Sequence, residues 1–323
     1  MEVEGLDGDV VAAAVVDMVP DAAPVAVDEV IPKGHRHFAW RMRSNVGPVV
    51  ARVRRGDGYD EVALSRLREH QRLALEGLPV PRAHGFGVSQ RLGGRSLVVT
   101  EYLDGVDAED FAATAAGPVM VDAMRSTGKA LARLHTVSVS GFGDPQPAPN
   151  PAATDLAGAA RRHLERLAEL YAELPENPLR QAGERLLLLL ADDLRDVVCP
   201  TVTHQDVYLP NILLDRHGRF RALLDLEHLR WADPVSDFVK PAMWMFDDHP
   251  EWAVSFADGY RTVAGTPTRW EERISLATGW ELLTGVGYWT SVGDDVTLQD
   301  YLARLRRWVA SDGISHVWSP DWR

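Results

Sequence analysis

A carboxylate and an amide five residues apart, followed by a second carboxylate, are the residues best suited to chemistry in this sequence. Asp206 and Asn211 lie in the segment 204–215, which leads directly into an apolar run. Asp225 lies fourteen residues after Asn211, in a second apolar run. Carboxylate and amide oxygens are ligands that Mg²⁺ prefers, and a carboxylate can accept the proton of an attacking hydroxyl group or orient it. The pattern predicts a phosphoryl-transfer site with Asp206 as the catalytic residue and with Asn211 and Asp225 as Mg²⁺ ligands.

Two short strands must bring these side chains together. The apolar runs 212–215 and 220–226 flank the turn sequence Arg-His-Gly-Arg, which predicts a β-hairpin. Because a hairpin returns its last residues beside its first, Asp225 should lie close to Asn211. The alternative is a turn in which Asp206 and Asn211 only cap backbone groups, as a lone Asp-x4-Asn would indicate. The hairpin and the aspartate at its end favour the phosphoryl-transfer site.

The elements around this segment change in character near residue 103. Before it, alternating or β-branched runs predict strands at 25–31, 38–43, 49–54, 83–88 and 96–102, with helices at 10–19 and 59–75. After it, apolar residues recur at helical spacing over 120–136, 156–174 and 178–197, and again between 237 and 308. This order predicts an α+β fold with a cleft where the β-rich part meets the helical part.

The catalytic segment resembles the aminoglycoside phosphotransferase family of small-molecule kinases. The family signature is His-Gly-Asp, four residues and Asn, and here His204-Gln205-Asp206 precedes Asn211 at that spacing. The downstream residues 233–238, Asp-Pro-Val-Ser-Asp-Phe, are similar to the family's Asp-Pro-x-x-Asp-Leu. The resemblance spans roughly residues 25 to 310 and is sharp between 200 and 240. Gln205 departs from the family pattern because it stands where the family usually has glycine.

This resemblance implies a bilobal protein-kinase-like fold. Residues 1–102 would form a small antiparallel-sheet N-lobe that clamps the nucleotide. Residues 103–323 would form a larger, mainly helical C-lobe with the catalytic loop and the acceptor site. It also implies that Asp237 braces the catalytic loop through His204, whose own role is then structural.

The resemblance assigns nucleotide-binding residues in the N-lobe less sharply. Arg52 stands where the family has a phosphate-binding lysine, with Arg54 and Arg55 as nearby alternatives, and Glu69 is its matching helix partner. A guanidinium can hold phosphates and a carboxylate bidentately. The phosphate loop corresponds to the segment with Lys33 and Gly34, although a basic β-turn explains that segment equally well. Backbone groups of Glu101 and Leu103 would contact adenine.

Composition and charge limit the partners. The formal net charge of −13 argues against a nucleic-acid partner. No apolar stretch reaches the length of a membrane helix, and the acidic N-terminus has no basic signal-peptide region, so we expect a cytoplasmic protein with no membrane partner. The single cysteine, Cys199, is predicted to be a buried spacer. The sequence leaves the oligomeric state open.

Together these features predict an ATP-dependent O-phosphotransferase that uses Mg²⁺ and phosphorylates a hydroxyl group of a small molecule. A composition rich in Arg, Ala and Asp is typical of high-GC bacterial genes, which favours an antibiotic or related secondary metabolite as acceptor. The alternatives are a sugar or amino-alcohol kinase of primary metabolism, and a pseudokinase that binds nucleotide without turnover. Candidate acceptor-pocket residues follow the catalytic segment: Trp244, Asp247, Asp248, Trp280, Glu281 and Trp289.

Overall fold

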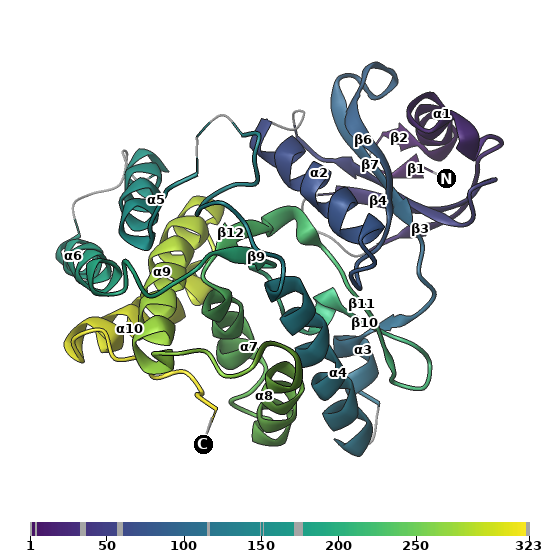
Figure 1. The fold of residues 1–323 in the computed structure, drawn as a ribbon. Helices are drawn as coiled ribbons and strands as arrows, with labels where there is room; N and C mark the ends of the chain where they lie inside the picture. Colours follow the sequence, from purple (N-terminus) through teal and green to yellow (C-terminus); the bar gives the residue numbers. More distant parts are fainter. Residues whose placement is uncertain are drawn as a thin grey trace.

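The N-terminal third of the chain forms a five-stranded antiparallel sheet. The structure, a computed structural model, describes residues 2–3, 5–32, 37–56, 61–114, 117–148, 150, 152–170 and 177–320. The strand order is β3-β4-β5-β7-β6, seen at the upper right of Figure 1. The five strands agree with the predicted ones to within one residue: β3 (Ala26–Ile31), β4 (His37–Arg43), β5 (Val49–Arg54), β6 (Ala83–Ser89) and β7 (Arg95–Glu101).

The side chains of β5 point alternately to the two faces of the sheet. Val49, Ala51 and Val53 are fully buried and pack in one cluster with residues of α1 (Gly8–Met18), whereas Arg52 points to the other face. On that face lies α2 (Glu61–Leu75), since Arg52 and Leu67 of α2 line the same small gap. The sheet therefore has α1 on one side and α2 on the side that holds Arg52.

The predicted hairpin is present and positions Asn211 beside the end of the returning strand. Strands β10 (Ile212–Leu214) and β11 (Phe220–Leu223) pair antiparallel, and β10 also pairs with β8 (Val106–Asp107). The backbone N–H of Leu224 donates to the carbonyl oxygen of Asn211 at 2.8 Å. Asp225 therefore follows directly after the residue that pairs with Asn211. A second short pair, β9 (Thr201–Thr203) with β12 (Arg230–Ala232), flanks the catalytic segment.

Helices make up most of the remaining chain and lie below the sheet in Figure 1. Two of them touch closely: a Cβ added at Gly128 of α4 would collide with the carbonyl oxygen of Phe256 on α8, so glycine is required there. The helices are α3 (Ala108–Ala112), α4 (Gly117–His135), α5 (Leu156–Leu170), α6 (Pro178–Asp193), α7 (Val239–Trp244), α8 (Pro250–Ala264), α9 (Trp270–Val292) and α10 (Asp295–Ala310). Short elements complete the chain: β1 (Glu2–Val3), β2 (Leu6–Asp7), η1 (Pro20–Ala22), η2 (Gln90–Leu92), η3 (Leu209–Asn211), η4 (Leu226–His228) and η5 (Pro234–Phe238).

The predicted α+β protein-kinase-like architecture is confirmed, with two differences of detail. The helix predicted over 178–197 ends at Asp193, because Leu194 leaves the helical conformation (φ −98°, ψ 3°) while its side chain stays in the core. Of the helix predicted over 156–174, residues 171–174 lie outside the described ranges. One cluster of buried residues contains only positions 11–99, whereas the other combines Leu73 and Val80 with positions from 108 onward. The exit of α2 thus packs on the larger core, and the lobe boundary after residue 102 stays a prediction.

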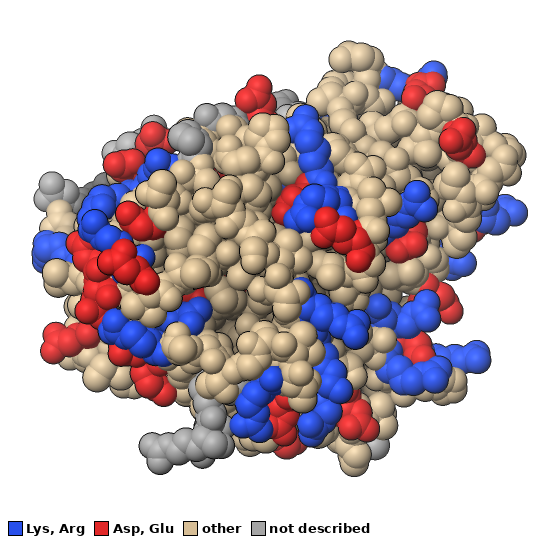
Figure 2. Space-filling view, in the orientation of Figure 1, with Lys and Arg blue, Asp and Glu red and all other residues tan. Residues whose placement is uncertain are grey.

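The surface carries both signs of charge. On the face shown in Figure 2, basic and acidic side chains are interspersed rather than gathered into one large patch of a single sign.

Cys199 is exposed, so its prediction as a buried spacer was wrong: it lies in the loop between α6 and β9. Among the described residues, no helix combines the length and the apolarity that crossing a bilayer requires.

His70 on α2 should make the fold sensitive to mild acid. The ring is 2% exposed and Nε2 donates to the carbonyl oxygen of Pro81 at 2.7 Å. Burial lowers the pKa of His70 to about 4 from 6.5. Between those values the unfolded chain binds a proton at His70 that the folded chain does not, so stability that is present above pH 6.5 is lost as the pH falls. From pH 7 to pH 5 this residue should lower the free energy of unfolding by about 2 kcal/mol.

The variant His70→Gln tests this effect, because its amide can donate to the same carbonyl without titrating. Urea unfolding at pH 7 and pH 5 should show a loss of stability that is about 2 kcal/mol smaller in His70→Gln than in the wild type. His217→Gln, in the exposed turn between β10 and β11, is the matched control and should lose as much as the wild type. An equal loss in all three proteins would show that His70 does not titrate on unfolding.

Candidate active site

Asp237 binds the backbone at the start of the catalytic segment 204–215. Its carboxylate accepts the backbone N–H groups of His204 (2.7 Å) and Gln205 (2.6 Å), and Nε2 of His135 donates to it at 2.9 Å. The carboxylate has no solvent exposure. Asp237 therefore reaches the loop through backbone amides, whereas the His204 ring bonds elsewhere, to the carbonyl oxygen of Leu224 at 2.8 Å. This arrangement ties the loop to the hairpin and to α4 together.

Gln205 has a left-handed backbone conformation, with φ of 67°. Only glycine adopts this region without steric cost, which gives a physical reason for the glycine that the resemblance leads one to expect here. In this chain the side chain is held by two hydrogen bonds, from Nε2 to the hydroxyl groups of Thr203 (2.9 Å) and Ser236 (2.6 Å). The glutamine thus keeps the turn that places Asp206, at a cost that these contacts offset.

Asp206 lies between an amine and an amide. Its Oδ1 accepts from Nζ of Lys240 at 2.6 Å, and its Oδ2 accepts from Nδ2 of Asn211 at 2.8 Å. Burial acts to raise the pKa of Asp206, but the charge and the hydrogen bond of Lys240 outweigh it, so the pKa lies below its ordinary value. The carboxylate is therefore ionised at neutral pH.

Lys240 was missed by the sequence analysis. It lies on α7, three residues after Asp237, and its environment is acidic on two sides. Burial acts to lower the pKa of Lys240, but Glu281 and Asp206 raise it overall, so the amine is charged. A signal was present, because the sequence has only three lysines, Lys33, Lys129 and Lys240, among 34 basic residues, and one of them follows the second motif.

Asp225 lies at the end of the hairpin, also with a left-handed backbone, at φ of 61°. Nη1 of Arg52 lies 3.3 Å from its Oδ1 and forms an ion pair across the junction of the sheet and the helical part. Asn211 donates through Nδ2 to Asp206, which leaves its amide oxygen available. An amide oxygen and a carboxylate on adjoining backbone match the oxygen donors that Mg²⁺ requires.

The predicted pairing of Arg52 with Glu69 is not found. Glu69 instead accepts from Arg72, one turn further along α2, at 2.7 and 2.9 Å, and from Nε1 of Trp231 at 3.3 Å. The physical reason is local: an arginine at i+3 on the same helix satisfies the carboxylate bidentately. Arg52 is paired with Asp225, so it faces the predicted metal site and not the helix.

Of the remaining residues predicted to bind the nucleotide, the structure describes Glu101 and Leu103. The N–H of Glu101 donates to the carbonyl oxygen of Arg82 at 2.8 Å, so only its carbonyl could meet a base. Leu103 follows at the connection between β7 and β8, half-buried. Lys33 and Gly34 lie outside the described residues.

A cavity of about 460 Å³ lies beside the catalytic loop. Its wall includes Gln205 and Val207, which flank Asp206, and Lys240, together with residues of α5, α9 and β12. This volume is within the range of small-molecule sites. Of the six acceptor-pocket candidates from the sequence, Trp280 and Glu281 line this cavity and the other four do not. Sequence reasoning missed the polar residues Asp144, His163, Arg166 and Arg230, which also line it.

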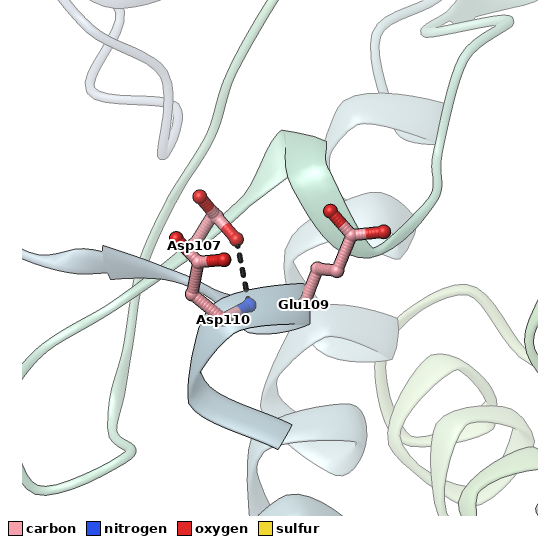
Figure 3. A group of neighbouring side chains, drawn as sticks. All are labelled: Asp107, Glu109 and Asp110. Atoms are coloured by element: carbon pink, nitrogen blue, oxygen red, sulfur yellow. Dashed lines mark hydrogen bonds between the residues drawn. The ribbon is translucent and has the colours of Figure 1, made fainter. Parts of the chain in front are cut away.

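A separate acidic group lies at the start of α3. Figure 3 shows Asp107, Glu109 and Asp110 with their carboxylates close together, and Oδ1 of Asp107 accepts the backbone N–H of Asp110 at 2.9 Å. Asp107 is the N-cap of α3, and Glu109 and Asp110 are exposed in its first turn, where acids favour the helix dipole. Helix capping explains this group, and it does not include the predicted metal ligands Asn211 and Asp225.

Comparison with known proteins supports the arrangement. The sequence profile of the phosphotransferase enzyme family matches residues 29–273. No curated protein matches the sequence. Similar solved structures include a thermostable mutant of aminoglycoside phosphotransferase APH(4)-Ia in a ternary complex with AMP-PNP and hygromycin B (TM-score 0.68, 18% identity, covering 93% of this chain and 98% of that one). A candidate fructosamine-3-kinase from Haemophilus somnus has a TM-score of 0.65 at 15% identity, with 94% and 96% covered. A macrolide 2'-phosphotransferase type I has a TM-score of 0.58 at 18% identity, with 94% and 98% covered.

Proposed function

Because the chain belongs to the phosphotransferase enzyme family, we propose that it transfers the γ-phosphoryl group of ATP to a hydroxyl group of a small molecule. One observation carries the proposal: an ionised, partly buried carboxylate, Asp206, is fixed by Lys240 and Asn211 beside a cavity of small-molecule size. The two residues that flank it in sequence, Gln205 and Val207, form part of that cavity wall. Lys240, which binds the Asp206 carboxylate, also lines the cavity, so an alcohol bound at this end of the cavity would lie near Asp206.

The residues divide the work as follows. Asp206 orients the acceptor hydroxyl group and receives its proton as the bond to phosphorus forms. Asn211 and Asp225 would hold Mg²⁺, which neutralises charge on the transferring phosphates when bound. Lys240 keeps Asp206 ionised and adds positive charge next to the reacting oxygen. Asp237 fixes the loop through the backbone amides of His204 and Gln205.

Asp225→Asn should weaken Mg-ATP binding by about tenfold or more while the protein stays folded. The change removes one anionic ligand. Asparagine tolerates a positive φ better than other non-glycine residues, so the backbone conformation at this position should survive. Isothermal titration with Mg-ATP measures the affinity, and Asp248→Asn, an exposed residue that does not line the cavity, is the matched control. Unchanged Mg-ATP affinity in a folded Asp225→Asn protein would remove Asp225 from the metal site.

For the acceptor, we propose an antibiotic or a related secondary metabolite. The fold is similar to that of an aminoglycoside phosphotransferase solved with hygromycin B and to that of a macrolide 2'-phosphotransferase. These similarities support an antibiotic as acceptor. A sugar or amino-alcohol kinase is the alternative, and the similar candidate fructosamine-3-kinase favours it. The pseudokinase alternative loses support because Asp206, Asn211 and Asp225 lie together in one loop and hairpin.

The experiment is a coupled assay for ADP release with Mg-ATP and a panel of hydroxylated antibiotics, sugars and amino alcohols. We expect acceptor-dependent turnover with at least one class. Nucleotide binding by titration calorimetry together with no turnover on any acceptor would favour the pseudokinase. The class that is turned over decides between the two proposed groups of acceptors.

A further inference from the structure

Three arginines surround one buried carboxylate in the wall of the cavity. Asp144, 8% exposed, accepts a hydrogen bond from Nη2 of Arg66 at 2.7 Å. Arg166 and Arg230 approach the same carboxylate only to 3.8 and 3.7 Å, beyond hydrogen-bond distance. We name Asp144, Arg66, Arg166 and Arg230 the arginine cluster. It carries three positive charges around one negative charge.

Arg166 and Arg230 both line the cavity, and neither comes within hydrogen-bond distance of Asp144. Nη2 of Arg166 contacts Nδ1 of His163 at 3.5 Å. Nε of Arg230 is buried and makes no hydrogen bond with any residue that the structure describes. Burial and the charges of Arg166 and Arg66 lower the pKa of Arg230 to about 9, which Asp144 offsets only in part. The Arg230 side chain is only 17% exposed, and a largely buried guanidinium requires anionic or hydrogen-bonding partners that the one shared carboxylate does not supply. The Arg166 side chain is 43% exposed, so solvent or a bound molecule can reach it.

The buried acids of the cavity wall are already engaged elsewhere. Asp233 is held bidentately by Arg273 at 2.6 and 3.0 Å. Asp237 braces the catalytic loop, and Glu281 accepts from Tyr301 at 3.0 Å and interacts electrostatically with Lys240. The other acids in the wall, Glu165 and Glu169, are exposed on α5. The less exposed part of the wall, around Asp144, therefore has more guanidinium groups than carboxylates that bind them, and the accessible carboxylates are Glu165 and Glu169 on α5.

We propose that Arg166 and Arg230 bind an anionic group of the acceptor, a carboxylate or a phosphate, so that the acceptor is an anionic hydroxyl compound. This inference rests on the proposed function, because it names the class of molecule that the same site phosphorylates. The anionic group is held by the two guanidinium groups while a hydroxyl group of the same molecule lies against Asp206. Both sets of residues line one cavity of about 460 Å³, which accommodates a compound the size of a sugar acid or a sugar phosphate.

Matched pairs of acceptors test the charge of the substrate with the full chain. Gluconate is compared with sorbitol, glucose 6-phosphate with glucose, and glucosamine and hygromycin B serve as cationic acceptors. The proposal predicts ADP release with kcat/KM about tenfold or more above the neutral partner for gluconate or for glucose 6-phosphate. The first result identifies a carboxylate and the second a phosphate. Preference for the neutral or cationic compounds would overturn the inference and leave the proposed kinase function intact.

Arginine variants locate the effect. Arg166→Gln and Arg230→Gln should each raise KM for the anionic acceptor by about tenfold or more, with KM for ATP unchanged. Arg161→Gln is the control, because Arg161 is exposed on the same helix α5, pairs with Asp192 and does not line the cavity. Equal KM values in all three variants would place the anion elsewhere.

Direct binding separates the inference from the proposed function. Titration calorimetry without nucleotide measures the affinity of gluconate and of glucose 6-phosphate for the wild type and for Arg230→Gln. Binding to the wild type that weakens in Arg230→Gln, without ADP release on any acceptor, would keep the anion site and reject the kinase function. If no anionic compound is bound and none is turned over, the inference is overturned.

Discussion

Asp206→Asn should lower kcat by about three orders of magnitude, the loss expected when a positioned general base is removed. The asparagine keeps the size of the side chain, and its amide oxygen can still accept from Asn211 or from Lys240. It cannot receive the proton of the acceptor hydroxyl group. We expect Mg-ATP affinity to change little, because the predicted metal ligands are Asn211 and Asp225. ADP release with a productive acceptor and calorimetric titration with Mg-ATP measure the two quantities.

The control for this variant is Asp248→Asn, which changes the same chemistry at an exposed position away from the cavity. Its kcat should equal that of the wild type. Thermal unfolding verifies that Asp206→Asn is folded, so that a loss of rate is a loss of chemistry. A kcat within tenfold of the wild type in a folded Asp206→Asn protein would assign the acceptor hydroxyl group to another residue.

The lowered pKa of Asp206 indicates that this carboxylate orients the acceptor hydroxyl group more than it acts as a strong base. Lys240 holds it in the ionised state, which makes it a weak base in the resting enzyme. Phosphoryl transfer through a loose transition state needs little proton removal before the bond to phosphorus forms, so orientation of the hydroxyl group matters more than basicity. Lys240 thus fits a site that positions its acceptor and takes up the proton late.

Much of the fold followed from local patterns in the sequence. The five strands of the sheet were predicted to within one residue because each has β-branched or alternating residues between turn signals. The hairpin after Asn211 was predicted because two apolar runs flank a four-residue turn. Helix ends were less well predicted: α6 stops at Asp193, where the backbone of the buried Leu194 turns out of the helix, and apolar spacing continues past that point in the sequence.

The site was predictable where its residues share one segment and not where they come from several. Asp206, Asn211 and Asp225 lie within twenty residues, and the hairpin register relates them. Arg52 and Glu69 were paired wrongly because the choice between Asp225 and Glu69 depends on how α2 sits against the sheet and on Arg72 at i+3. The arginine cluster joins α2, α5 and β12 with the loop at Asp144, and spacing within any one of these segments does not indicate it.

Asp237→Asn should lower the free energy of unfolding by about 3 kcal/mol and reduce activity as well. The unexposed carboxylate accepts from the backbone amides of His204 and Gln205 and from the buried His135 ring. An asparagine has one oxygen, so its NH₂ group must face at least one of the backbone N–H groups, and that buried donor loses its partner. The left-handed turn at Gln205 that aims Asp206 then loses an anchor.

Urea unfolding at pH 7 measures the change in stability, and initial rates at a permissive temperature measure the change in activity. Asp192→Asn is the matched control, because Asp192 is a surface residue paired with Arg161 and Arg195, and such pairs contribute about 1 kcal/mol or less. If Asp237→Asn were as stable and as active as Asp192→Asn, the loop would hold its conformation without this carboxylate. The expected difference between the two variants instead follows from location: one aspartate is screened by water, and the other is the sole acceptor that the described structure shows for two buried amides.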